Sequence, residues 1–273
     1  MSGSRRPVIL TFFAACAYGF LYLPIVVLIV YSFNRDGVGG FPPRHLTLDW
    51  YRVLFADGSM WTAVGNSVIV AAASVVISIL IGFPAAYALD RYSFPGKDAF
   101  RRLILLPLIV PGVITGISLL LLVVSGGFRL SLITVVLGHA TALTAVATTE
   151  IFAGLSRLDR SYEEASADLG ASGWQTLRRI LLPLMRTSLL GTALLVFTLS
   201  MDEIAVTFFL IGRENTLPLE IWSRLRRGAT PEMNAISTLI FFFSVAAILA
   251  SQRLIAGGET SLTPSAEVAG VTQ

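Results

Sequence analysis

Six long apolar stretches constrain this chain more than any other feature of its sequence. Each is long enough to cross the roughly 30 Å hydrocarbon core of a bilayer as an α-helix. The 273 residues are 55% hydrophobic and 14% charged, whereas a soluble domain carries roughly 25% charged residues. We therefore predict an all-α integral membrane protein that forms a single transmembrane domain over residues 1–273. The predicted spans are 8–32, 63–89, 103–124, 132–155, 188–211 and 235–254, followed by a flexible C-terminal tail at 256–273.

The amino-terminal apolar run is predicted to be an uncleaved first span. It continues from Val8 to about Tyr31, well beyond the roughly 7 to 15 residues of a signal-peptide core. The single cysteine, Cys16, lies inside this run and cannot form an internal disulfide. No redox compartment follows from it.

A charged island interrupts the apolar pattern between the fourth and fifth predicted spans. Ser161 with Glu164 has the spacing of a capping box, and Gly170 suits the left-handed position that ends a helix. Ser172 with Gln175 then predicts the start of a second helix, until Pro183 disturbs it. The sequence thus predicts two short helices joined at a glycine.

This island resembles the EAA loop of permease subunits of type I ABC importers, a cytoplasmic helix pair that docks into the ATPase subunit. The chain departs from that motif at Ser166, where the family usually has a second alanine. The resemblance implies a cytoplasmic helix-turn-helix coupling loop at 156–187. The residues expected to couple to the ATPase are Glu164, Ala165, Asp168, Gly170, Ile180, Leu182 and Pro183.

The distribution of positive charge agrees weakly with this orientation. Of the 20 Lys and Arg residues, twelve fall in segments that it places in the cytoplasm and eight in external segments. The segment 212–232, which carries Arg224, Arg226 and Arg227, is responsible for most of the weakness. We expect it to fold back as a partly inserted or protein-covered helix, with its arginines paired to acids or facing a water-filled vestibule.

The fifth predicted span contains two carboxylates. Asp202 and Glu203 are costly at this depth of a bilayer, so they are expected to face a pathway or a partner. Ser200, Glu203 and Thr207 fall at i, i+3 and i+7, which predicts one polar stripe. Facing a water-filled passage, such a stripe would hold a cation. The alternative is a salt bridge to an arginine of the segment 212–232.

The acids and the segment 212–232 also resemble those of polyamine permeases, whose acids are implicated in solute passage. One departure weakens the assignment of the solute, because Gly112 follows Pro111 where those permeases commonly have an acidic residue. Trp50 in the first external loop is expected to anchor at the membrane interface. The alternative for Trp50 is contact with a binding protein or with the solute.

Two further features concern packing. Pro107, Pro111, Gly112 and Gly116 in the third span predict either a bend beside a cavity or a tight helix contact, and both alternatives stay open. His139 in the fourth span is predicted to be a hydrogen-bonded packing residue rather than a ligand.

Several kinds of chemistry are missing from the sequence. The only lysine, Lys97, lies in no P-loop motif, so the chain is not expected to hold ATP itself. The two histidines have no neighbours at zinc-ligand spacing, and no nucleophile and base stand together. We predict no enzyme activity, no metal and no bound cofactor, with ATP and Mg²⁺ belonging to a partner ATPase.

We therefore predict a multi-pass permease subunit in the bacterial inner membrane, with both termini in the cytoplasm. It would translocate a small, polyamine-like cation by alternating access. The expected partners are two ATPase subunits, a second homologous permease, an extracytoplasmic binding protein and the lipid bilayer, without nucleic acid. The alternatives are an ABC permease for another small organic solute such as an amino acid or opine, an ion-coupled secondary transporter, and a membrane enzyme using Asp202 and Glu203.

Overall fold

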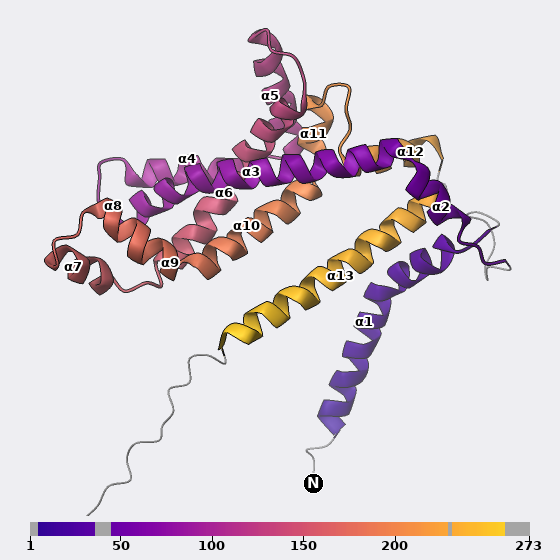
Figure 1. The fold of residues 1–273 in the computed structure, drawn as a ribbon, viewed down its shortest axis with the longest axis horizontal. Coiled ribbons are helices and arrows are strands. Elements are labelled where there is room, and N and C mark those ends of the chain that lie inside the picture. The colour runs from indigo at the N-terminus through magenta and orange to yellow at the C-terminus, as the bar shows by residue number, and fades with distance from the viewer. Residues whose placement is uncertain (1–4, 36–44, 229–230, 260–273) are drawn as a thin grey trace, which may run out of the picture. The chain divides into compact units, whose positions relative to one another are not determined.

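The computed structural model describes residues 5–35, 45–228 and 231–259, and within these ranges the chain is helical (Figure 1). The described part contains no strand, only an isolated antiparallel bridge between Asn34 and Leu46. The chain divides into two compact units, residues 58–223 and the two terminal segments 1–57 and 224–273.

The terminal unit is built around two long helices. Helix α1 (Arg5–Ser32) contacts α13 (Pro231–Glu259), and α13 also contacts the short α2 (Asp49–Ala56). Residues 256–259 of the predicted tail belong to α13, and the rest of that tail lies outside the described residues. Trp50 donates its indole N–H to the carbonyl of Asn34 at 2.8 Å, which fixes α2 against the end of α1.

The central unit is organised by α3 (Gly58–Arg91) and α6 (Leu132–Leu155), which pack along each other, and by α10 (Arg186–Met201), which packs against both. Small residues allow the close approach of α3 and α6. A Cβ added to Gly82 would lie 3.1 Å from the Cβ of Ala147. The buried apolar core here consists of Ala86, Leu143, Ala147, Ile151, Leu155, Met185 and Val196.

The predicted third span is two helices rather than one. Helices α4 (Lys97–Ile109) and α5 (Gly112–Ser125) meet at an angle of 104°. Val110 between them is extended, with φ −77° and ψ 126°, because a residue before proline is pushed out of the helical region and Pro111 has no N–H to continue the ladder. The span predicted over 103–124 is therefore bent, and a bend was one of the two alternatives predicted for it.

The fifth predicted span is also interrupted. Helix α10 ends at Met201, and α11 (Ala205–Leu210) begins only after three intervening residues. On its other side, α10 meets the helical segment Gly173–Leu184 at 71°. By length and composition, the described residues hold three helices able to cross a membrane, or up to five when each bent pair counts as one span.

The segment 212–232 contains α12 (Leu217–Arg227), and its first residues are held in the central unit. Leu217 donates its N–H to the hydroxyl of Ser67 at 2.7 Å, and the Asn66 amide donates to the carbonyl of Asn215 at 2.9 Å. In the terminal unit, Arg224 forms ion pairs with Asp57 at 2.6 Å and Glu232 at 3.1 Å. The predicted pairing of an arginine of this segment with acids is therefore confirmed for Arg224.

Candidate functional site

The charged island folds into a helix pair that we call the knob, residues 161–184. Its first helix, α7 (Ser161–Asp168), ends in a Schellman motif. Gly170 donates to the carbonyl of Ala167 at 2.8 Å, and Ala171 donates to that of Ser166 at 3.1 Å. Gly170 has φ +77°, so its predicted left-handed conformation is confirmed.

The two predicted helix starts differ in outcome. Ser172 and Gln175 form the expected capping box at the start of α8 (Gly173–Thr176), with each side chain accepting from the other residue's N–H. The capping box of Ser161 with Glu164 is wrong. The carboxylate of Asp159 instead accepts from the N–H of Ser161 at 2.9 Å, and this hydrogen bond lowers the pKa of Asp159.

One buried hydrogen bond joins the two helices of the knob. The hydroxyls of Ser166 on α7 and Thr176 on α8 lie 2.8 Å apart, and both residues are buried. An alanine at position 166 would provide no such bond. Ser166, where this chain departs from the family motif, thus forms a hydrogen bond with Thr176 that the sequence pattern did not indicate.

The second helix of the knob leads into the core. After α8 the chain makes a single π turn (Leu177–Leu181) and then the short α9 (Leu182–Leu184). Pro183 has no N–H to donate and its ring crowds the preceding turn, which accounts for the widened turn before it. Leu181 and Met185 are buried, and Met185 belongs to the apolar core with Ile151 and Leu155.

The outer surface of the knob exposes large apolar side chains. Leu169 is 89% exposed, Trp174 67% and Tyr162 51%. Of the residues predicted to couple to the ATPase, Glu164, Ala165, Asp168, Gly170 and Pro183 are exposed, whereas Ile180 and Leu182 are half-buried. An apolar patch on a polar loop is typical of a protein-docking surface.

The second region of interest is the break between α10 and α11. Asp202 is exposed at this break, and Glu203 is half-buried. The Glu203 carboxylate accepts from the N–H of Val206 at 2.9 Å, so it caps the start of α11. The continuous polar stripe predicted for Ser200, Glu203 and Thr207 is wrong because the helix that would carry it is interrupted.

Ser200 and Thr207 are brought together by His139 instead. His139 Nδ1 lies 2.8 Å from the Ser200 hydroxyl and Nε2 lies 2.8 Å from the Thr207 hydroxyl, and all three residues are buried. Thr207 donates its only hydroxyl hydrogen to the carbonyl of Glu203, so Nε2 must donate to Thr207 and Nδ1 must accept from Ser200. The prediction that His139 is a hydrogen-bonded packing residue is confirmed.

The bend of the third span lies directly against this break. A Cβ added to Gly116 would lie 2.7 Å from the Phe209 ring and 3.1 Å from the carbonyl oxygen of Ala205. A Cβ on Gly112 would lie 3.3 Å from the Cβ of Ala205 and 3.6 Å from Oε1 of Glu203. The tight helix contact predicted as one alternative for the third span is therefore present, and it lies beside the bend. An acid at position 112 would stand beside Glu203.

Metal-binding residues do not gather in the described ranges. There, no three or more His, Cys, Asp and Glu side chains lie close enough together to hold a metal ion.

Long apolar helices with bent or broken spans among them are typical of helical membrane transport proteins. Residues 78–257 match the family model described as "Binding-protein-dependent transport system inner membrane component". The chain belongs to this family, and it is a permease subunit of an ABC importer.

Similar proteins include two polyamine permeases. The spermidine/putrescine transport system permease protein PotC of Haemophilus influenzae is 34% identical over 241 residues, which cover 88% of this chain and 93% of that protein. The putrescine transport system permease protein PotI of Escherichia coli K12 is 37% identical over 235 residues, 82% of each chain.

Solved ABC transporters share the fold. A chain of a bacterial transporter that imports the acidic polysaccharide alginate matches with a TM-score of 0.72 at 21% identity, covering 91% of this chain and 94% of that one. A chain of the MetNI methionine transporter in an inward-facing conformation matches with a TM-score of 0.60 at 16% identity, covering 78% and 99%. At these identities the likeness shows the fold alone.

Proposed function

We propose that this permease passes a small cationic solute of the polyamine class through the inner membrane, driven by ATP hydrolysis in separate subunits. The observation that carries the proposal is the 34–37% identity, over most of the chain, to permeases named for spermidine and putrescine. The chemistry at the break between α10 and α11 supports it, because Asp202 and Glu203 lie there as acids among apolar helices.

The solute pathway is proposed to run along this break. Irregular backbone within a membrane is tolerated where it is covered by protein or lines a water-filled cavity. Asp202 is exposed and free to meet a passing ammonium group, whereas Glu203 caps α11 and supplies charge nearby. Ser200 and Thr207 contribute through their bonds to His139, by holding α6 against both halves of the broken span. Trp50 is proposed to face the binding protein or the solute.

The knob is proposed to be the cytoplasmic attachment for the ATPase. Leu169, Trp174 and Tyr162 supply an exposed apolar surface, and the adjacent Glu164 and Asp168 supply charge. In this orientation both termini are cytoplasmic and the chain crosses the membrane six times as one transmembrane domain, with the third and fifth crossings bent. Movement of the knob would open the pathway alternately outward and inward.

The proposed complex contains this permease, a second homologous permease, two ATPase subunits that bind ATP and Mg²⁺, and an extracytoplasmic binding protein. Dependence on a binding protein is in the description of the family. Because one chain supplies one knob, a second permease is required for the second ATPase.

The proposed solute is tested by reconstituting this complex in liposomes and measuring which compounds stimulate ATP hydrolysis. Putrescine or spermidine is expected to stimulate it through the binding protein. Stimulation by a neutral or anionic compound, with no response to either polyamine, would overturn the proposed solute class.

That outcome would favour a second candidate, a permease for another small organic solute. The observation behind it is Gly112, which removes an acid from the position beside Glu203. Membership in a binding-protein-dependent family leaves the ion-coupled transporter and the membrane enzyme without support.

A further inference from the structure

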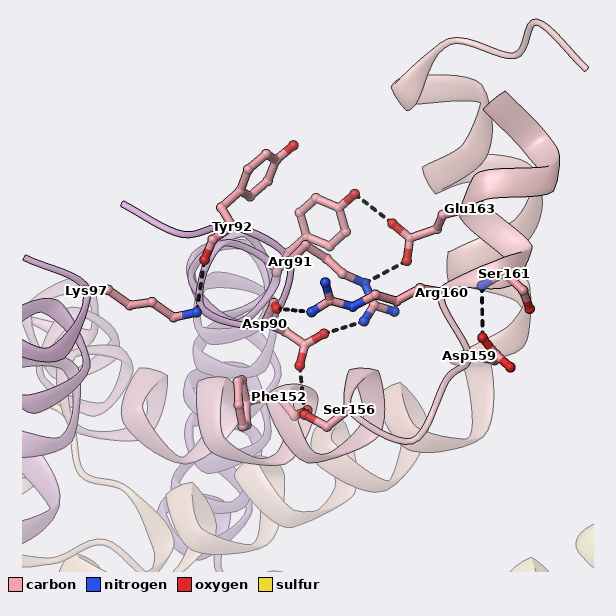
Figure 2. Close-up of polar contacts among 11 residues, drawn as sticks. Asp90, Arg91, Tyr92, Lys97, Phe152, Ser156, Asp159, Arg160, Ser161 and Glu163 are labelled. Carbon is pink, nitrogen blue, oxygen red and sulfur yellow. Dashed lines mark hydrogen bonds and ion pairs between the residues drawn. The ribbon is translucent and has the colours of Figure 1, made fainter. Parts of the chain in front are cut away.

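A cluster of charged and polar side chains ties the knob to the end of α3. Figure 2 shows Glu163 of α7 pointing at Arg91, the last residue of α3. Arg91 Nε lies 2.7 Å from Oε1 of Glu163, and the Tyr87 hydroxyl donates to Oε2 at 3.1 Å. Both carboxylate oxygens of Glu163 are therefore engaged by one helix, and they hold α7 in a fixed direction relative to α3.

The same cluster reaches the chain that leads from α6 into the knob. Asp90, beside Arg91, forms an ion pair with that arginine and accepts from the Ser156 hydroxyl at 2.8 Å. The Arg160 guanidinium donates to the carbonyl of Asp90 at 2.8 Å (Figure 2). The end of α3, the end of α6 and the start of α7 thus share one polar network.

The link between Arg91 and Glu163 is largely shielded from water. Their side chains are 8% and 18% exposed, and Nη2 of Arg91 is buried without a hydrogen-bond partner among the described residues. Removing one partner of a buried pair leaves an uncompensated charge, so such a pair resists separation far more than a surface pair does.

Apolar packing does not provide this attachment. The one buried side chain of α7 is Ser166, and its hydroxyl binds within the knob. The second half of the knob enters the core through Leu181 and Met185. In the described chain, the knob therefore has an apolar attachment after α8 and a polar attachment from α7 to α3 through Glu163.

We propose that Glu163 and Arg91 are positioning residues for energy coupling: their ion pair makes α7 and α3 move as one body when the ATPase displaces the knob. The proposal rests on the proposed function of the knob. Because α3 packs along α6 for much of its length, a displacement of α7 then reaches the centre of the transmembrane unit. Without the Glu163 carboxylate, only the hydrogen bond from Arg160, which precedes α7, to the Asp90 carbonyl links the start of α7 to the end of α3 within the ranges that the structure describes, and α7 can then shift relative to α3.

The first test measures this rigidity and needs no solute. In a Cys16→Ser background, spin labels are attached at the exposed positions Ala167 and Leu80 in the complete complex. The distance between the labels is expected to stay the same with and without ATP and vanadate, and to change or broaden on ATP binding in the Glu163→Gln variant. A distance that changes in the parent complex, or one that stays fixed in Glu163→Gln, would overturn the proposal.

The second test measures coupling in proteoliposomes as putrescine transported per ATP hydrolysed. In Glu163→Gln, which keeps the size of the side chain, the ratio is expected to fall at least about fivefold per assembled complex, the lower end of typical couplings between sites. The matched control Glu150→Gln removes an exposed charge from α6 and is expected to keep the parent ratio. An unchanged ratio in Glu163→Gln contradicts the proposed role of the ion pair. A parent complex that does not respond to putrescine contradicts the proposed solute instead, and the role of the ion pair is then decided by the distances between the spin labels.

Discussion

At the scale of single residues, the central unit depends on side chains that bind across helices. His139 is the best example, because its two ring nitrogens bind Ser200 on α10 and Thr207 on α11. One buried imidazole therefore connects the two halves of a broken span to the helix beside them. These two hydrogen bonds hold the break in one geometry.

Replacing His139 is expected to destabilise the protein. In His139→Leu the buried hydroxyl of Ser200 loses its partner, which costs about 1–3 kcal/mol of unfolding free energy. Thermal unfolding of the purified protein in detergent measures this loss as a lower Tm. Thr141→Ala is the control, since Thr141 is exposed and its hydroxyl binds only the carbonyl of Leu137 in its own helix. Equal Tm values for the two variants would argue against a structural role for His139.

At the scale of elements, the two broken spans are packed against each other at glycines. Gly116 of α5 lies so close to Phe209 and Ala205 of α11 that no side chain fits without movement. The bend at Pro111 directs α5 toward this contact. Close packing of this kind at a small residue is how helices associate without a hydrophobic driving force between them.

A pair of glycine substitutions distinguishes this contact from ordinary helix propensity. Gly116→Ala is expected to destabilise the protein by about 1–3 kcal/mol, because overpacking forces neighbouring side chains and backbone to shift. Gly191→Ala on α10 has nothing within 4 Å of the added Cβ and is expected to stabilise by about 0.5–1 kcal/mol through the lower helix propensity of glycine. Chemical denaturation measures the unfolding free energy of both variants. If Gly116→Ala proved as stable as Gly191→Ala, the tight contact at Gly116 would be contradicted.

At the scale of the whole molecule, we propose that solute handling and energy coupling take place at different parts of the central unit. Asp202, at the proposed solute site, lies at the break between α10 and α11. Gly170, at the proposed coupling site, follows the first helix of the knob. The apolar core around Met185, Ile151 and Val196 lies between α10, α6 and the end of the knob. The two sites should therefore fail independently when their own residues are changed.

Asp202→Asn and Gly170→Leu test this separation. Asp202→Asn removes an exposed charge and is expected to weaken cation-stimulated transport about tenfold, the effect of ~1.4 kcal/mol, while the ATPase still binds. Gly170→Leu forces a branched side chain into a left-handed position, at roughly 1–2 kcal/mol, and is expected to weaken ATPase binding instead. Co-purification of the ATPase and uptake of labelled putrescine measure the two effects. If both variants lose both functions in the same proportion, the two sites are not separate.

Much of the architecture could be predicted from the sequence because its causes act over a few residues. The length of an apolar run decides whether a helix can cross a bilayer. Gly170 ends a helix because glycine itself adopts the left-handed backbone conformation without strain. Ser172 and Gln175 cap α8 within one turn. Pro111 breaks the third span for the same local reason. The EAA-like spacing likewise indicated the family, which the comparisons confirm.

Only the tertiary structure decided which polar groups meet. Glu163 binds Arg91, 72 positions away, and His139 binds Ser200, 61 positions away, so no local pattern reveals these pairs. The polar stripe of Ser200, Glu203 and Thr207 was wrong because the break at 202–204 turns Glu203 into a helix cap. A sequence determines a helix through neighbours one turn apart, whereas packing alone brings distant helices together and selects the partner that satisfies each buried hydrogen bond.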